Sequence, residues 1–397
     1  MLFAGNVYSS DTVLTCENKE AIPETYFGMH VHRFHDKRLI PPAAEFGVWR
    51  LWDAGVAWRD LEPARGTWDF RRLDLAVAIS EQMGTEVGLT LGATPKWASS
   101  RPSESAFMGE GAAAEPVNLD DWDRYVETLA KRYKGRIKFY ELWNEPGSAG
   151  FFSGSVATMI ELSRRAYKII KVIDPSATVV TPSPAKFVSL PWFREFIEKG
   201  GGAYADVAGY HFYTDQARPE ALIDLVRQVK AIVRPRFPSM PIWNTESGLR
   251  FSTPQEAFLQ GKAGLPSSSA HLARWLTLGW CLGLKRFIYY AWDNGELGLV
   301  DPSTGASRTT LIGWSGAYRW LLGTRMSSCK LSGGVWECEI VRPGKGPAFI
   351  NWAAGQAVSK KLNMDEFVFV EDLAGSAQKI NIRELTVTPS PILVNPT

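Results

Sequence analysis

Two glutamates that follow apolar, strand-like runs are the residues in this chain best suited to acid–base chemistry. Glu145 lies in YELWNEPG and Glu246 lies in PIWNTESG, each close to a tryptophan and an asparagine. A single glutamate in a turn is usually only solvated. A pair at one site supplies a proton donor and an ionised partner, because apolar surroundings and a neighbouring negative charge raise the pKa of one carboxyl group. Two such groups are the minimum machinery for cleaving a glycosidic bond.

Eight short apolar runs that alternate with amphipathic segments predict how these glutamates are positioned. The runs lie at 26–32, 47–52, 86–92, 137–143, 178–183, 206–213, 241–246 and 286–292. This alternation is typical of a parallel sheet with helices between its strands. Eight repeats over about 300 residues favour a closed (β/α)8 TIM barrel over an open doubly wound sheet. No GxGxxG follows the first run to indicate a dinucleotide-binding fold.

Closure of such a barrel brings the two glutamates together although they are far apart in the sequence. They follow the fourth and seventh runs, and the C-terminal ends of all barrel strands meet at one rim, where the active site lies. Long loops after the third and eighth runs, at 99–118 and 294–310, are expected on the same face.

After about residue 325 the pattern changes to short alternating strands separated by turns, as in VWECEIVR and LTVTPSPILV. This alternation predicts a small β-sandwich-like domain. We therefore expect a catalytic barrel at 26–325 and an accessory β-domain formed by 326–397 together with 1–25.

Two motifs in the predicted barrel resemble those of a known enzyme clan. The WNEP of 143–146 resembles the acid/base motif of clan A retaining glycoside hydrolases, and the TES of 245–247 resembles the nucleophile position of that clan. Within the clan, a barrel followed by a small β-domain looks like glycoside hydrolase family 39, which includes β-xylosidases, α-L-iduronidases and bacterial exopolysaccharide hydrolases. Families 5, 30 and 51 share the same glutamate scheme and stay open as alternatives.

The resemblance implies a retaining double displacement with a role for each motif residue. Glu145 is expected to be the general acid/base and Glu246 the nucleophile that forms a glycosyl-enzyme intermediate. Asn144 is expected to hydrogen-bond the 2-hydroxyl of the sugar, and Tyr213 to donate a hydrogen bond to Glu246. The carboxyl groups of a retaining pair lie about 5–5.5 Å apart, whereas those of an inverting pair lie about 6.5–9.5 Å apart.

Further residues at the strand ends are implied to contact the substrate, although each has a structural alternative. His211 is expected beside the sugar in the −1 subsite, with Trp292 as its stacking floor. Arg50 is expected to support the nucleophile by its charge, or else to pair with Asp53 or Glu141. His30 and His32 lie on the same strand face and either contact hydroxyl groups or pack in the barrel. Trp97 either lines a subsite or anchors the loop that carries it.

Two other functions use the same residues or the same fold. A transglycosidase differs only in how water is excluded from the second step. A non-catalytic carbohydrate-binding barrel is expected to have lost a glutamate or Asn144, and neither is lost here. The sugar, its linkage and the choice between exo- and endo-action are left open by the sequence.

The composition fits a carbohydrate partner and gives no support to a nucleic acid or a membrane. The 44 basic and 42 acidic residues are interspersed, and no basic stripe stands out. The 16 Trp, 12 Tyr and 20 Phe either fill a large core or stack on sugar rings. No run of about 18 apolar residues predicts a membrane-spanning helix. The oligomeric state is left open.

Four cysteines show no spacing typical of a metal site, so we expect neither a metal nor another cofactor. Cys281, in an apolar helical stretch, is expected to be an unpaired core thiol, whereas Cys329 and Cys338 flank a hairpin and pair if the compartment is oxidising. The first residues show no basic segment before an apolar run. The compartment therefore stays open between a secreted or periplasmic protein with its leader trimmed and a cytoplasmic one.

Overall fold

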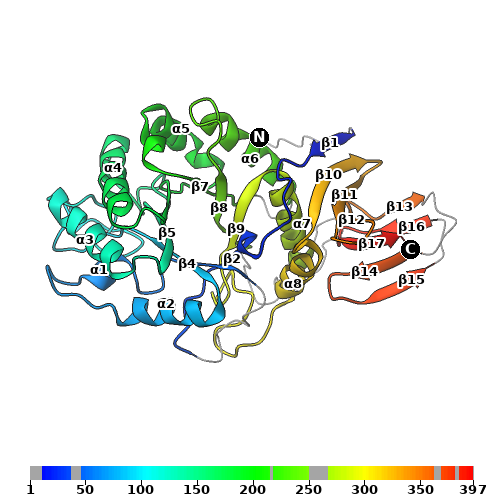
Figure 1. The fold of residues 1–397 in the computed structure, drawn as a ribbon, viewed down its shortest axis with the longest axis horizontal. Helices are drawn as coiled ribbons and strands as arrows, with labels where there is room; N and C mark the ends of the chain where they lie inside the picture. Colours follow the sequence, from blue (N-terminus) through cyan, green and yellow to red (C-terminus); the bar gives the residue numbers. More distant parts are fainter. Residues whose placement is uncertain are drawn as a thin grey trace.

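The computed structural model describes residues 11–36, 46–214, 218–249, 267–361, 368–380 and 384–396. Its larger part is a parallel eight-stranded sheet in the order β6-β5-β4-β3-β2-β9-β8-β7 (Figure 1). The strands are β2 (Phe27–Met29), β3 (Val48–Leu51), β4 (Glu86–Thr90), β5 (Ile137–Glu141), β6 (Thr178–Val180), β7 (Ala208–His211), β8 (Ile242–Ser247) and β9 (Leu284–Tyr289). A parallel bridge between Val180 and Val207 joins the two end strands, so the sheet closes into the expected barrel.

Helices surround the barrel, and all except the short first one form from the amphipathic segments that the sequence places between and after the strand-like runs. They are α1 (Trp58–Leu61), α2 (Arg71–Met83), α3 (Leu119–Arg132), α4 (Val156–Ile173), α5 (Leu190–Glu198), α6 (Ala221–Val233), α7 (Ser268–Cys281) and α8 (Thr309–Leu321). The described part of the segment between β2 and β3 contains no α-helix, so this strand–helix repeat differs from the expected pattern. Across the described ranges, every helix is too short or too polar to cross a membrane.

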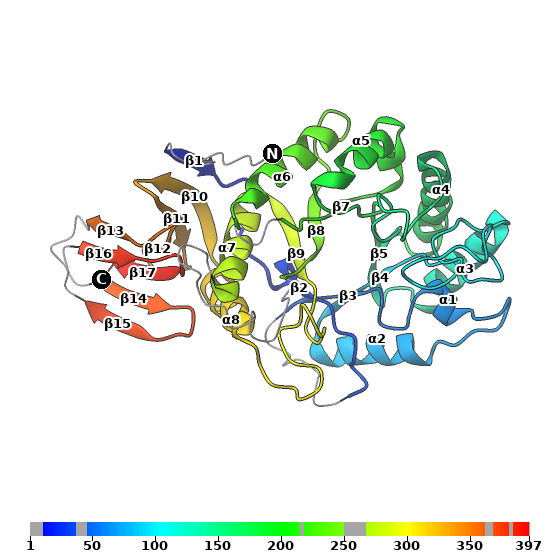
Figure 2. The same cartoon turned by 180° about the vertical axis from the view of Figure 1, so that it is seen from behind.

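The local sequence explains where α3 begins and which face it buries. The side chain of Asn118 accepts a hydrogen bond of 3.0 Å from the amide of Asp120 and so caps the first turn. Trp122, Tyr125 and Leu129 recur at helical spacing and are fully buried against the barrel. By contrast, α7 is buried on every side, because it lies between the barrel and the C-terminal strands (Figure 2).

The C-terminal part is an antiparallel domain, as the sequence predicts. A seven-stranded sheet has the order β1-β10-β11-β12-β17-β14-β15, and a two-stranded sheet pairs β13 with β16. Their bounds are β1 (Thr12–Thr15), β10 (Arg325–Ser332), β11 (Val335–Val341), β12 (Pro347–Ala353), β13 (Val358–Lys361), β14 (Val368–Asp372), β15 (Ala377–Ile380), β16 (Glu384–Val387) and β17 (Ile392–Pro396). Side chains from both sheets, among them Val335 and Val387, share a small core. These positions support the proposed division of the chain near residue 325.

A buried ion pair joins this domain to the barrel. The guanidinium of Arg274 on α7 donates to the carboxylate of Glu220 at 3.1 Å and to the carbonyl of Ala353 at 3.0 Å. The indole of Trp352 on β12 donates to the same Glu220 carboxylate at 2.8 Å. The Arg274 and Glu220 side chains are 1% and 8% exposed, so each charge depends on the other for compensation.

All four cysteines form disulfides, which corrects the expectation for Cys281. Cys281 is bonded to Cys16, which lies 265 residues away in the sequence, and it is therefore not an unpaired thiol. Cys16, which directly follows β1, reaches Cys281 at the end of α7 because β1 adds to the edge of the C-terminal sheet. Spacing in the sequence does not reveal this contact. Cys329 on β10 forms a disulfide with Cys338 on β11. The sequence left open whether these two cysteines pair.

Removing the carboxylate of Glu220 tests the junction between the domains. Glu220→Ala leaves the Arg274 charge buried without a carboxylate, so the free energy of unfolding is expected to fall by about 3–5 kcal/mol. The matched control is Glu81→Ala, which removes one partner of an exposed pair with Arg136 and is expected to cost less than about 1 kcal/mol. Chemical denaturation measures both variants, and equal losses would contradict a stabilising role for the junction.

Candidate active site

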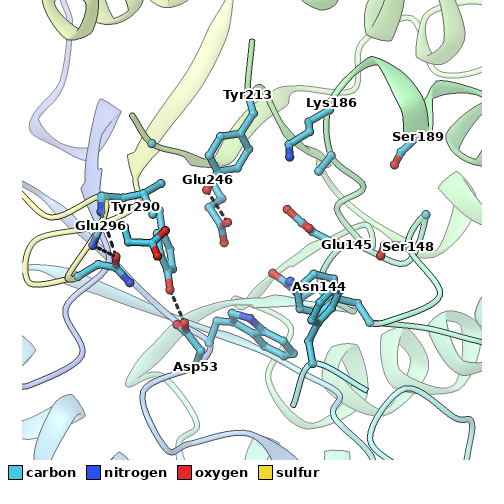
Figure 3. A pocket seen from close by; sticks show the side chains of 18 of the residues that line it. Asp53, Asn144, Glu145, Ser148, Lys186, Ser189, Tyr213, Glu246, Tyr290 and Glu296 are labelled. Carbon is cyan, nitrogen blue, oxygen red and sulfur yellow. Dashed lines mark hydrogen bonds between the residues drawn. The ribbon is translucent and has the colours of Figure 1, made fainter. Parts of the chain in front are cut away.

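A cavity of about 980 Å³ opens at the C-terminal ends of the barrel strands, and both glutamates line it (Figure 3). Its lining includes residues from the ends of six strands: Trp52, Asp53, Asn144, Glu145, Lys186, Tyr213, Glu246 and Tyr290. The two long loops also contribute, through Phe107 and Met108 after β4 and through Asn294–Leu297 after β9. The expectation that these loops lie on the glutamate-bearing face is therefore confirmed.

Glu145 sits in a backbone conformation that few residues other than glycine adopt. Its φ is 43°, in the left-handed region, which costs about 1–3 kcal/mol for such a residue. The strand-like pairing of the preceding Asn144 with Ser183 and a hydrogen bond of 2.9 Å from the Glu145 amide to the Ser183 carbonyl hold this conformation. The turn places the side chain in the cavity, where it stays 17% exposed.

Glu246, on β8, is held by donors on both carboxylate oxygens. The hydroxyl of Tyr213 donates to Oε1 at 2.8 Å, and the guanidinium of Arg50 donates to Oε2 at 2.9 Å. Burial raises the pKa of Glu246, while the positive charges of His211 and Arg50 act in the opposite direction. Two hydrogen bonds to the carboxylate fix its orientation and favour its ionised form.

The two carboxylates face each other across a short gap. One oxygen of Glu145, one oxygen of Glu246 and one ring nitrogen of His211 all lie within 4.8 Å of one another. Carboxylate oxygens this close together are expected of a retaining pair, in which one carboxylate attacks the sugar directly.

His211, at the end of β7, is buried next to both glutamates and is not among the residues that line the cavity. Its Nδ1 is 2.9 Å from Glu145 and 3.8 Å from Glu246. Burial opposes protonation of the ring, but the negative charges of Glu246, Glu141 and Glu145 outweigh it and raise the pKa of His211 to about 9. The imidazolium therefore lies between the two carboxylates, closer to Glu145.

Arg50 connects the site to the interior of the barrel. It donates to Glu141, to Glu246 and, at 2.9 Å, to Oδ1 of Asn144. Arg50 therefore makes a contact expected under each of the two alternatives, one with Glu246 and one with Glu141. Burial opposes ionisation of Glu141, yet the charge of Arg50 and the hydrogen bond with His211 lower its pKa to about 2.

The two histidines after β2 have different surroundings. His30 is buried, its Nε2 is 3.3 Å from Arg50, and burial together with that positive charge lowers its pKa. His32 lies between Asp53, at 2.9 Å, and Asp293, at 3.1 Å. Burial opposes its protonation, but these two carboxylates raise the pKa of His32 to about 10. His32 therefore holds the carboxylate of Asp53, which lines the cavity, in position. Neither His30 nor His32 is among the residues that line the cavity.

The two tryptophans expected near the sugar are not among the residues that line the cavity. Trp292 is 7% exposed and packs in the main core. Trp97 lies edge-on to Trp58 and donates to the carbonyl of Glu62 at 2.8 Å, so it anchors its loop, which was the alternative interpretation. In their place Tyr290 lines the cavity and donates a hydrogen bond to Asp53.

Some cavity residues had no sequence motif to identify them. Lys186 follows β6, and Phe151 follows the WNEP segment. Tyr290 is the second tyrosine of YYAW, and only its position at the end of the eighth strand pointed to it. The sequence indicated these residues only through their position after a predicted strand.

The group of Glu145, His211 and Glu246 has ligand atoms close enough together to hold a metal ion. However, Arg50 donates to Glu246, and the high pKa of His211 keeps its ring protonated. A cation at this position would face two positive charges and would displace hydrogen bonds already made. The donor set therefore suits a sugar hydroxyl better than a metal ion.

Comparison with known proteins gives one family and several similar structures. The model of glycosyl hydrolases family 39 matches residues 46–261. The structure resembles a family 39 glycoside hydrolase from Bacteroides cellulosilyticus WH2, with a TM-score of 0.75, 17% identity and coverage of 94% of this chain and 81% of that one. It also resembles a monomeric beta-xylosidase from Caulobacter crescentus CB15, with a TM-score of 0.69, 16% identity and coverage of 96% and 97%.

A third solved structure, the GH39 enzyme from Xanthomonas axonopodis pv. citri, has a TM-score of 0.66, 15% identity and coverage of 96% of each chain. None of the curated proteins matches the chain. The structural likenesses, all below one-fifth identity, establish the fold, and the family model covers more than half of the sequence. The chain therefore belongs to glycosyl hydrolases family 39, a retaining family of clan A, and is a glycoside hydrolase.

Proposed function

We propose that Glu145 is the general acid/base and Glu246 the nucleophile of a retaining hydrolase that acts on an oligo- or polysaccharide. The observation that carries this assignment is a pair of carboxylates in one cavity, with oxygens within 4.8 Å of each other, that differ in their hydrogen-bond donors and in their exposure. Glu246 accepts hydrogen bonds from Tyr213 and Arg50, which suits a nucleophile that must be ionised. Glu145 is more open to the cavity, as a group that exchanges a proton with substrate and water must be.

In the first step Glu246 attacks the anomeric carbon while Glu145 gives its proton to the leaving oxygen. The bond from the anomeric carbon to that oxygen breaks, and a covalent ester with Glu246 forms. Arg50 fixes Oδ1 of Asn144, which leaves the amide NH₂ of Asn144 to donate to the 2-hydroxyl of the sugar. That contact strengthens as positive charge develops on the ring.

In the second step Glu145, now ionised, removes a proton from water on the side that the leaving group has vacated. The hydroxyl oxygen attacks the anomeric carbon, the ester breaks and Glu246 returns to its carboxylate form. The ring of His211, with Nδ1 2.9 Å from Glu145, holds the Glu145 side chain in position through both steps. Two displacements at one carbon retain the anomeric configuration.

The charged residues of the cavity favour a neutral sugar. Among the lining residues, Asp53, Glu145, Glu246 and Glu296 are acidic and Lys186 is basic, so the lining offers no group of basic side chains for an anionic ring. The buried cations Arg50 and His211 already pair with glutamates of the site. The solved structures with the same fold include proteins named beta-xylosidase and glucosidase. We therefore propose a β-linked neutral glycan as the substrate, and we assign no role to nucleic acid.

Removing the nucleophile gives the sharpest test of these roles. Glu246→Ala is expected to lower kcat by about 10,000-fold or more, because no covalent intermediate can form. Added azide is expected to restore turnover by entering the vacated space and to give a glycosyl azide of inverted configuration. Glu127→Ala, which alters an exposed side chain on α3, is the control. Near wild-type activity of Glu246→Ala would show that the nucleophile lies elsewhere.

The charge of His211 predicts a pH dependence of stability. Its pKa rises from 6.5 to about 9 on folding, so the folded state binds the proton more tightly than the unfolded chain does. The resulting stabilisation, up to about 3 kcal/mol, is complete below about pH 6.5 and is lost as the pH rises to about 9.

His211→Asn is therefore expected to flatten this fall in the free energy of unfolding between pH 6.5 and pH 9. His32, which is unchanged in the variant, continues to contribute a fall over a similar range. Denaturation curves at several pH values measure the slope, and His35→Asn, at an exposed position, is the control. An unchanged slope in His211→Asn would refute the protonated state of His211.

A further inference from the structure

An aromatic ridge formed by Trp52, Phe107 and Phe151 continues the cavity beyond Glu145. All three side chains line the same cavity as the two glutamates. The ring centroids of Phe107 and Phe151 are 4.7 Å apart, and those of Trp52 and Phe151 are 6.4 Å apart. Phe107 is 70% exposed, whereas Trp52, at the inner end of the ridge, is 4% exposed. The outer end of the ridge, at Phe107, therefore exposes an aromatic ring to solvent on one wall of the cavity.

Backbone contacts hold the outer end of the ridge in place. The amide of Phe107 donates to the carbonyl of Gly150 at 3.0 Å, and a Cβ atom on Gly150 would lie 2.3 Å from the Phe107 ring. The ring therefore rests on backbone that only glycine leaves uncovered. The amide of Phe151 in turn donates to the carbonyl of Ser148, and the amide of Ser148 donates to the carbonyl of Glu145. These bonds tie the ridge to the turn that carries Glu145.

The position of the ridge relative to Glu145 indicates which part of a substrate it meets. The general acid lies next to the oxygen of the leaving group, so the leaving unit must extend along the wall on its side. Glu145 and Ser148 lie on the opposite side of Glu246 from Tyr290 and Glu296 (Figure 3). The ridge belongs to the Glu145 wall, while Tyr290 and Glu296 flank the sugar whose anomeric carbon is attacked.

We propose that Phe107 and Phe151, supported from behind by the buried Trp52, form a subsite that stacks on a pyranose ring on the leaving side of the cleaved bond. A pyranose presents an apolar face of C–H groups that packs on aromatic rings, while polar side chains, among them Ser148 and Lys186, line the same cavity and face its hydroxyl groups. The inference rests on the proposed function. It selects β-linked glycans with a further sugar on the leaving side as the substrate class, over glycosides with a small leaving group.

Matched pairs of substrates separate this subsite from the catalytic step. The pairs are β-D-xylosyl fluoride with xylotetraose, β-D-glucosyl fluoride with cellotetraose, and β-D-mannosyl fluoride with mannotetraose, and the pair that the wild type cleaves is used. The tetrasaccharide reaches the ridge, whereas fluoride does not. Phe107→Ala is expected to lower the ratio of kcat/KM for the tetrasaccharide to kcat/KM for the fluoride by about five- to tenfold.

Two further variants complete the design. Phe107→Tyr keeps the stacking face and is expected to restore most of the ratio. Phe369→Ala removes another exposed phenylalanine, 43% exposed on β14 and not part of the cavity lining, and is expected to leave both rates unchanged. Because Phe107 is largely exposed, its removal is expected to leave the melting temperature within a few degrees of the wild type.

The outcomes distinguish this inference from the function on which it rests. A ratio unchanged in Phe107→Ala, with both substrates cleaved, overturns the subsite and leaves the roles of Glu145 and Glu246 standing. If the wild type cleaves none of the fluorides and none of the tetrasaccharides, the proposed function fails and the subsite fails with it. A ratio that falls in Phe107→Ala and recovers in Phe107→Tyr supports the stacking.

Discussion

The buried guanidinium of Arg50 is the interaction on which the rest of the site depends. Three carboxylates, Glu141, Glu145 and Glu246, are grouped at the end of the barrel, and grouping them without positive charge would protonate or expel them. Arg50 donates to Glu141 and Glu246, and His211 supplies a second positive charge close to Glu145. The two cations allow one carboxylate to stay ionised deep in the protein while another remains open to the cavity.

This charge network exists only because the barrel closes. Arg50 comes from β3, Glu141 from β5, His211 from β7 and Glu246 from β8, so no local segment contains the site. The network is also rigid, since each oxygen of Glu246 has its own donor and Asn144 is fixed by Arg50. Preorganised donors of this kind need no rearrangement as charge moves during the reaction.

The sequence predicted the features that follow strand periodicity and strand ends. All eight barrel strands and the rim position of both glutamates lie where they were expected. The hydrogen bond from Tyr213 to Glu246, which the resemblance to clan A enzymes implied, is also present. Loop-dependent features were not predictable in this way. Trp292 and Trp97 turn into the core, and Cys16 pairs with Cys281 across 265 residues. The packing of Phe107 against Phe151 depends on Gly150 leaving room for the Phe107 ring, which no spacing rule expresses.

Trapping the covalent intermediate is the most direct test that Glu246 is the nucleophile and Glu145 the acid/base. A 2-deoxy-2-fluoro glycosyl fluoride of the accepted sugar slows both steps, and its good leaving group lets the first step proceed without acid assistance, so the ester accumulates. Mass spectrometry of the intact protein followed by peptide mapping locates the added sugar. We predict one sugar per chain, attached to Glu246, in the wild type and in Glu145→Ala. A sugar attached to another residue, or cleavage with inversion and no adduct, would contradict the account.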